Sequence, residues 1–162
     1  MAAPGTPPII ATVGPDGSLM APLRLFYPYD RTVGAVIGRF LTSLAEKKIE
    51  GTRGVDASVH VPPLEFDPAT GAALTEWVAV GDTGLVLTWS WQPEPFADNT
   101  LQQPFAWALI LLDGADTPML HAVRVASVSE MSTGMRVRAV WAAGPTPSIT
   151  AIMCFEPEDA HG

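Results

Sequence analysis

The sequence is poor in cysteine, in basic residues and in long apolar runs. Its one cysteine, Cys154, excludes an intramolecular disulfide and a cysteine-rich metal centre. Nine Lys and Arg face 17 Asp and Glu, so the net charge of −8 argues against nucleic acid and anionic membranes as partners. No apolar run reaches about 18 residues, and no charged-then-apolar leader opens the chain. These features predict a cytoplasmic protein without a membrane span.

What is present describes a folded chain. Hydrophobic residues make up 48% of the 162 positions and charged residues only 16%, which is typical of a globular domain and not of a disordered one. Sixteen prolines favour many turns and short strands over long helices. The length suits one domain, with or without a small appendage.

The first fifty residues divide into an arm and a helix. Residues 1–29 read as an extended arm with a Pro-Asp-Gly turn, and its apolar residues Leu23 to Tyr27 need a surface to pack on. Residues 30–51 are predicted to hold an amphipathic helix over 32–50, capped by Asp30 or Thr32, ending at Lys47 and Lys48 and stopped by Gly51. Its apolar face recurs at three- and four-residue intervals. The partner-facing candidates on it are Val33, Ile37, Phe40, Leu41 and Leu44.

The rest of the chain changes from irregular to alternating. Residues 52–73 contain turns and no helix pattern, whereas residues 74–157 alternate with a period of two. Five strands are expected, around 85–92, 105–112, 119–125, 135–141 and 149–155. A single helical turn is expected between Ser127 and Gly134, where an OB fold carries its connecting helix. The fold class is therefore mainly β, a five-stranded OB-fold barrel, because a β-sandwich usually needs about seven strands; residues 158–162 form a tail.

An ordered series of motifs resembles a known family. They are Glu50-Gly-Thr-Arg53, Val59-His-Val-Pro-Pro63, Leu74-Thr-Glu-Trp-Val78, Gly84-Leu-Val-Leu-Thr88, Pro104 to Ile110 with Leu112-Asp-Gly114, Gly134-Met-Arg-Val-Arg138 and Cys154-Phe-Glu-Pro157. They cover about four-fifths of the chain and resemble the DUF35 family, a rubredoxin-like zinc ribbon followed by an OB fold. Within that family the chain resembles zinc-free members of the actinobacterial type.

The resemblance implies four zinc-ligating cysteines around the Val-Pro-Pro turn. Alignment on residues 59–63 puts Arg53, Asp56, Asp67 and Thr70 at those places. These side chains cannot replace thiolates in a tetrahedral zinc site, so residues 52–73 are predicted to be a degenerate, metal-free ribbon segment. An ion pair between Arg53 and Asp56 or Asp67 is the expected substitute.

The resemblance also implies a function. Similar proteins are accessory subunits of thiolase-like enzymes and of lipid-transfer-protein-like aldolases that act on acyl-CoA thioesters, including steroid side chains. The expectation is a non-catalytic subunit of a hetero-oligomer that helps to shape acyl-CoA access, with no cofactor of its own and a CoA thioester as the ligand it would meet.

Candidate binding residues come from the aromatic strands and from a basic stripe. They are Trp91, Phe105, Trp107, His121, Arg136 and Arg138. Paired arginines suit the phosphates of CoA, but a solvated strand face is the more ordinary interpretation of Arg136 and Arg138, as the core is of Trp107.

The residues indicate little catalytic chemistry of their own. The sequence has no phosphate-binding Gly-rich loop, nucleophile elbow or His-x-x-x-His spacing. Cys154 reads as a buried small hydrophobe, His60 as structural, and Asp113 and Asp116 as turn formers. A stand-alone protein that binds an acyl-CoA or another apolar ligand at the barrel mouth remains the alternative.

Overall fold

The computed structural model describes residues 11–21 and 32–158. These residues fall into two units, one ending at Thr32 and one beginning at Val33. In the first unit, β1 (Thr12–Val13) and β2 (Leu19–Met20) form an antiparallel hairpin, in which Gly17 takes the positive φ of 80° that the predicted Pro-Asp-Gly turn requires. Leu23 to Tyr27 and the expected cap Asp30 lie outside the described residues.

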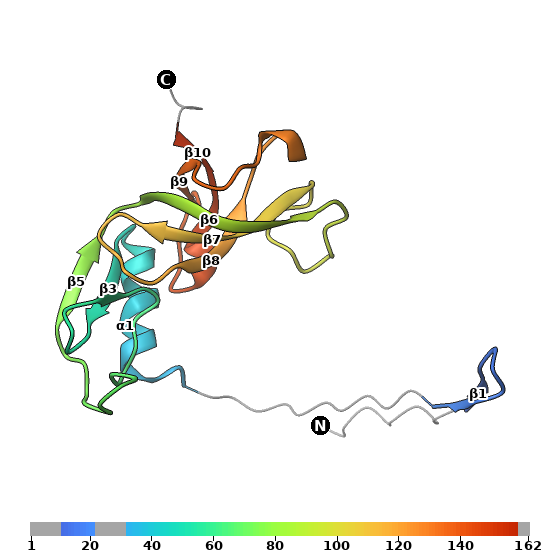
Figure 1. Cartoon of the computed structure of the whole chain (residues 1–162), viewed down its shortest axis with the longest axis horizontal. Coiled ribbons are helices and arrows are strands. Elements are labelled where there is room, and N and C mark those ends of the chain that lie inside the picture. The colour runs from blue at the N-terminus through green and yellow to red at the C-terminus, as the bar shows by residue number, and fades with distance from the viewer. Residues whose placement is uncertain (1–10, 22–31, 159–162) are drawn as a thin grey trace. The chain divides into compact units, whose positions relative to one another are not determined.

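The second unit holds a closed five-stranded barrel with the strand order β10-β8-β7-β6-β9 (Figure 1). The strands are β6 (Thr83–Gln92), β7 (Phe105–Leu112), β8 (Met119–Val123), β9 (Arg136–Trp141) and β10 (Ile152–Pro157). All neighbours pair antiparallel except β8 and β10, which pair parallel. This is the OB-fold arrangement, and the prediction of that fold is confirmed.

Two short 3-10 helices interrupt the strands. The first, η1 (Val128–Glu130), lies in the link between β8 and β9, as expected. The second, η2 (Ile149–Ala151), replaces the start of the predicted fifth strand. Its cause is local: the Ser148 side chain accepts a hydrogen bond from the Thr150 N–H and caps the turn. The last strand therefore begins at Ile152 instead of residue 149.

The predicted helix is shorter in the structure. Helix α1 spans Gly34–Ala45, with Val33 as its N-cap and no side-chain cap, so the expected capping by Thr32 is wrong. It ends because Lys47 adopts a positive φ of 60°, while the N–H of Lys47 bonds Leu44 and that of Lys48 bonds Ser43. This is a Schellman ending made without glycine. Gly51, the predicted stop, lies in a strand instead.

That strand belongs to a small sheet, here called the finger (residues 49–80). It contains β3 (Ile49–Arg53), β4 (Val59–His60) and β5 (Trp77–Val80), in the order β4-β3-β5. A Cβ at Gly51 would lie 2.4 Å from the carbonyl oxygen of His60, so only glycine allows this close pairing. Strand β5 lies beyond the expected boundary at residue 73 and pairs with β3 of the finger, not with a barrel strand.

Helix, finger and barrel share one core. Phe40 and Leu44 of α1 and Ile49 of β3 belong to the same buried cluster as the inward residues of the barrel strands. The turn before β8 also holds the finger: Asp116 exchanges two hydrogen bonds of 2.8 Å with the backbone of Val59, and the Thr117 hydroxyl accepts from the Val61 N–H. The barrel and the finger are therefore joined by packing and by hydrogen bonds.

Candidate functional site

The outer face of three adjacent barrel strands carries no charged side chain, and its apolar residues lie among the polar Thr88 and Ser90 of β6. Strands β6, β7 and β8 contain no Asp, Glu, Lys or Arg. On β7, residues 106, 108, 110 and 112 are buried in the barrel, so the odd-numbered residues face outward. The outward apolar side chains, which we call the apolar wall, are Leu85, Leu87, Trp107, Leu109, Leu111 and Leu120.

The strand register brings four of these leucines into two cross-strand pairs. Leu85 lies opposite Leu111, and Leu109 lies opposite Leu120 on the other side of β7. Leu120 is 59% exposed and Leu87 is 43% exposed. Antiparallel sheets that face water normally carry polar side chains on that face. Six apolar side chains on this face form a patch of the kind that marks an interaction surface.

The β6–β7 loop covers one end of this outer face. Phe105 is buried under it, in a small cluster with Leu101, Ala122 and Cys154. The rings of Trp107 and Phe105 form an edge-to-face pair with centroids 5.1 Å apart, and Trp107 remains 37% exposed. Of these two predicted binding residues, Phe105 is buried in the fold, whereas the Trp107 side chain is accessible to a partner or ligand.

The other predicted ring residues face the barrel interior. Trp91 is half-buried and packs against the main core, as Trp89 does. His121 is 7% exposed and lies edge-to-face with Phe155 at 5.5 Å. The Ala122 N–H donates to its Nδ1 at 3.0 Å, and burial lowers the pKa of His121 below its usual 6.5. The imidazole is consequently neutral and structural in this position.

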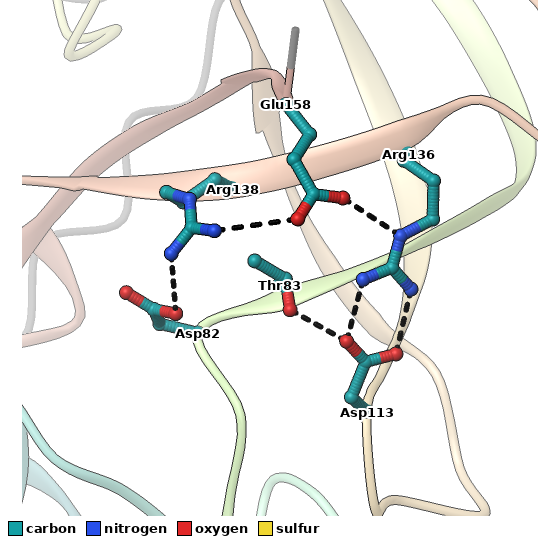
Figure 2. A network of polar contacts seen from close by, with 6 residues as sticks. All are labelled: Asp82, Thr83, Asp113, Arg136, Arg138 and Glu158. Carbon is teal, nitrogen blue, oxygen red and sulfur yellow. Dashed lines mark hydrogen bonds and ion pairs between the residues drawn. The ribbon is translucent and has the colours of Figure 1, made fainter. Parts of the chain in front are cut away.

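Arg136 and Arg138 are held in a network of carboxylates (Figure 2), which we call the charged seam. Arg136 forms a bidentate pair with Asp113 at 2.6 and 2.7 Å and also bonds Glu158 at 2.9 Å. Arg138 contacts Asp82 and Glu158 at 3.4 and 3.3 Å. The Arg136 guanidinium, with the Thr83 hydroxyl, lowers the pKa of Asp113 to about 2. Because three carboxylates surround two guanidinium groups, the stripe is not a free phosphate site.

The helix candidates divide between this chain's own core and its surface. Phe40 and Leu44 are buried inside the unit, 2% and 0% exposed, and cannot meet a partner. Val33 is 57% exposed, and Ile37 and Leu41 are half-buried. Only the last three remain available as contact residues.

The four positions where the resemblance implies zinc do not fit it. The Arg53 guanidinium bonds Glu76 at 2.7 Å and the carbonyl of Ala57, so the predicted pairing with Asp56 or Asp67 is wrong. Asp56 accepts from the N–H and hydroxyl of Ser58. A guanidinium and two carboxylates engaged by other donors offer no soft tetrahedral ligand set.

Asp67 links the two turns of the finger instead. Its carboxylate, 4% exposed, accepts from the Val55 N–H of one turn and from the N–H groups of Ala69 and Thr70 in the other. The Thr70 hydroxyl also donates to it at 3.0 Å. The Val55 and Thr70 N–H groups lower the pKa of Asp67. Within residues 11–21 and 32–158, no three His, Cys, Asp or Glu side chains gather as a metal site would require.

One groove escaped the sequence reasoning. It has a volume of about 420 Å³ and lies where β8 and β10 end side by side, lined among others by Arg124, Glu130 and Glu156. Arg124 donates to Glu156 at 2.5 Å, and Glu130 accepts from the Ala126 N–H. The sequence places Arg124 directly after an apolar strand, but the parallel pairing that brings Glu156 beside it is not readable from the pattern.

The buried thiol is consistent with its structural interpretation. Cys154 is 0% exposed, and burial raises the pKa of its thiol to about 11.

The described helices include none long and apolar enough to cross a bilayer.

Comparison with known protein families finds a match to most of the barrel. Residues 77–142 match the family described as ChsH2, C-terminal OB-fold domain. The match covers less than half of the chain and shows what its barrel segment is similar to. Curated protein sequences give no match to the chain.

Two solved structures share the fold. A chain of the "Ltp2-ChsH2(DUF35) aldolase" aligns with a TM-score of 0.59 at 16% identity, over 79% of this chain and 98% of that one. A DUF35-family protein of unknown function from Sulfolobus solfataricus aligns with the same TM-score and identity, over 78% of this chain and 85% of that one. Family match and fold together support the DUF35 assignment predicted from the motifs.

Proposed function

We propose that this DUF35 protein is a non-catalytic accessory subunit of a lipid-transfer-protein-like or thiolase-like enzyme acting on acyl-CoA thioesters. It binds the catalytic chain and helps to shape the opening for the acyl-CoA. The observation that carries the proposal is the apolar wall, an uncharged outer face over three strands.

The wall has an energetic consequence. Full burial of a Leu side chain contributes about 1.5–3 kcal/mol relative to exposure. The side chains of the wall are only partly buried in the isolated chain. Part of their burial free energy is therefore not gained on folding and is available for binding. A partner with a matching apolar surface can complete this burial, and interface cores are enriched in aromatic residues such as Trp107.

Charge selects the kind of partner. Two copies of a chain with a net charge of −8 repel each other, which disfavours a homodimer. Nucleic acid and anionic lipid need clustered Lys and Arg, whereas Arg136 and Arg138 are neutralised in the charged seam. A different protein chain fits the wall best.

Two further observations support the proposal. The fold is shared with a chain of the "Ltp2-ChsH2(DUF35) aldolase", whose name joins a DUF35 protein to an aldolase. In addition, the buried His121 and Cys154 are held in unreactive forms, and Asp113 and Arg136 are paired with each other. The chemistry is therefore assigned to the partner.

The test is affinity purification of the tagged chain from its native host, with mass spectrometry of its companions and the mass of the complex. We expect a stoichiometric lipid-transfer-like or thiolase-like subunit. Leu120→Asp should weaken that complex at least tenfold, because it places a charge in a dry interface. Val55→Asp, at a finger position 60% exposed, is the control. A monomer without a companion would overturn the proposal.

A stand-alone ligand-binding protein is the second candidate, favoured by the 420 Å³ groove beside Arg124, whose size suits a small-molecule site. Calorimetric titration of the isolated chain with acyl-CoAs of different lengths tests it. Saturable heat that Arg124→Ala removes would support this reading, and absence of heat would reject it.

A further inference from the structure

The loop between β6 and β7 exposes a large aromatic side chain. Phe96 is 71% exposed. The loop projects from the end of the barrel opposite to the finger and α1 (Figure 1). It begins at Gln92, the last residue of β6, and returns to β7 at Phe105. A phenyl ring at such a place has no packing role in the isolated unit, which points to a contact outside it.

Hydrogen bonds order the loop around this ring. The Phe96 N–H donates to the Asn99 side chain at 2.9 Å, and the Asn99 N–H donates to the Phe96 carbonyl at 2.9 Å. The Gln102 amide then donates to the carbonyl of Asn99 at 2.6 Å, and the Gln92 amide to that of Glu94 at 2.5 Å. These contacts pre-form the turn that presents Phe96. A pre-ordered aromatic loses little conformational entropy when it is buried by a partner.

The base of the loop is fixed to the barrel. Leu101 is 6% exposed and packs with Phe105 and Cys154. Phe105 in turn contacts Trp107 of the apolar wall. The base of the loop is therefore packed against the wall through Phe105. A partner that covers the wall is thereby brought close to the loop.

The charges of the loop define what would receive Phe96. Residues 93–104 carry two ionisable side chains, Glu94 and Asp98, and both are acidic. Each lies two residues from Phe96 in sequence. Acidic flanks disfavour insertion into an anionic membrane and complement a basic rim. A second copy of the chain would repeat the same negative charges.

We propose that Phe96 is an anchor that inserts into an apolar pocket bordered by Lys or Arg on the catalytic subunit. The inference rests on the proposed function and adds the residue, the pocket chemistry and the sign of the surrounding charge. Hot-spot residues of this kind are ordered, aromatic and buried only in the complex.

The experiment measures binding of the full chain to the co-purified catalytic subunit by surface plasmon resonance. Phe96→Ala should weaken binding about 30-fold or more, chiefly through faster dissociation. Phe96→Leu should retain most of the affinity, because an apolar pocket accepts it. Phe66→Ala is the matched control: Phe66 lies on the finger, is 58% exposed, and should have no effect. Equal circular-dichroism melting curves show that all variants fold.

A second variant tests the charge. Glu94→Gln with Asp98→Asn should slow association about three- to tenfold at low salt and flatten the salt dependence of the association rate. An unchanged salt dependence would overturn the basic rim.

The outcomes separate the two proposals. A wild type that does not bind any catalytic subunit removes the proposed function and this inference together. A wild type that binds, with Phe96→Ala binding equally well or Phe66→Ala binding equally poorly, overturns the anchor and leaves the function standing. Sedimentation of the wild type with phosphatidylcholine–phosphatidylglycerol vesicles, lost in Phe96→Ala, would assign the ring to a membrane instead.

Discussion

Two neighbouring surface regions of the barrel differ in polarity. The apolar wall of β6, β7 and β8 leaves leucines and a tryptophan partly exposed without a charge among its strands. The charged seam beside it pairs every guanidinium with a carboxylate of this chain. The charges of the seam are therefore paired within one chain, whereas the apolar side chains of the wall remain partly exposed in it.

The difference separates the residues that stabilise the fold from those that are available for binding. Ion pairs of the seam are close to half exposed, so they join chain segments with small individual contributions. The inward faces of the wall strands supply most of the stability, through residues such as Val86 and Ile110 at 0% exposure. The outward faces supply none of comparable size and are free to serve a partner.

The largest expected effect concerns the inward face. Ile110→Ala should reduce the free energy of unfolding by about 2–5 kcal/mol, because it leaves a cavity in the centre of the barrel. Urea denaturation followed by tryptophan fluorescence measures it. A loss below 1 kcal/mol would mean that the core collapses around the smaller side chain, and would weaken the contrast between the two faces of β7.

The inward face should also make stability depend on pH through His121. Burial holds the pKa of His121 in the folded chain below the usual 6.5. The unfolded chain then binds more protons as the pH falls below about 6.5, so stability should decrease there, by at most about 1.4 kcal/mol per pH unit. Denaturation at pH 7.5, 6.5 and 5.5 tests this. His121→Gln should lack that part of the decrease; an identical pH profile would contradict the assignment.

The seam should respond weakly and in a salt-dependent way. Arg136→Met removes the bidentate pair with Asp113, so the melting temperature should fall by less than for Ile110→Ala, and the difference should shrink in 1 M NaCl. Since Asp113 has a pKa near 2 in the fold against 3.8 normally, its contribution is present above about pH 4 and lost as the pH falls towards 2. The gap between wild type and variant should therefore narrow from pH 4 to pH 2 and close only below pH 2; a gap that does not narrow over this range would show a packing role for Arg136.

The smallest effect on stability is expected at the wall itself. Leu120→Ser, at a position 59% exposed, should change the unfolding free energy by no more than about 0.5 kcal/mol. The same variant should still weaken the complex. If it destabilised the isolated chain as much as Ile110→Ala, the distinction between a folding face and a partner face would fail.

The sequence allowed the barrel to be predicted and misled at the boundaries. Alternation along 105–112 made β7 readable, and the Ser127–Gly134 link placed the 3-10 turn correctly. The predicted helix extends too far, because Gly51 reads as its stop although Lys47 has already turned the chain. Propensity cannot reveal a left-handed lysine, since its stabilisation comes from the hydrogen bonds that close the turn.

The candidate site was predicted in part. The aromatic strands were found, and Trp107 is accessible as a binding residue must be. Arg136 and Arg138 were found as a stripe, but their partners Asp82, Asp113 and Glu158 come from three distant parts of the chain. Phe96 was not singled out, because a single phenylalanine in a Pro-rich loop carries no periodic signal.

Sequence alone therefore determined the class of the fold, the positions of the five strands within a few residues and the poor match of residues 53, 56, 67 and 70 to zinc. These follow from local alternation, turn chemistry and residue type. Only the tertiary structure decided which side of each strand faces water, which charges neutralise one another and how Asp67 closes the finger. Those outcomes depend on strand register and on contacts between residues far apart in the chain, and no local pattern records them.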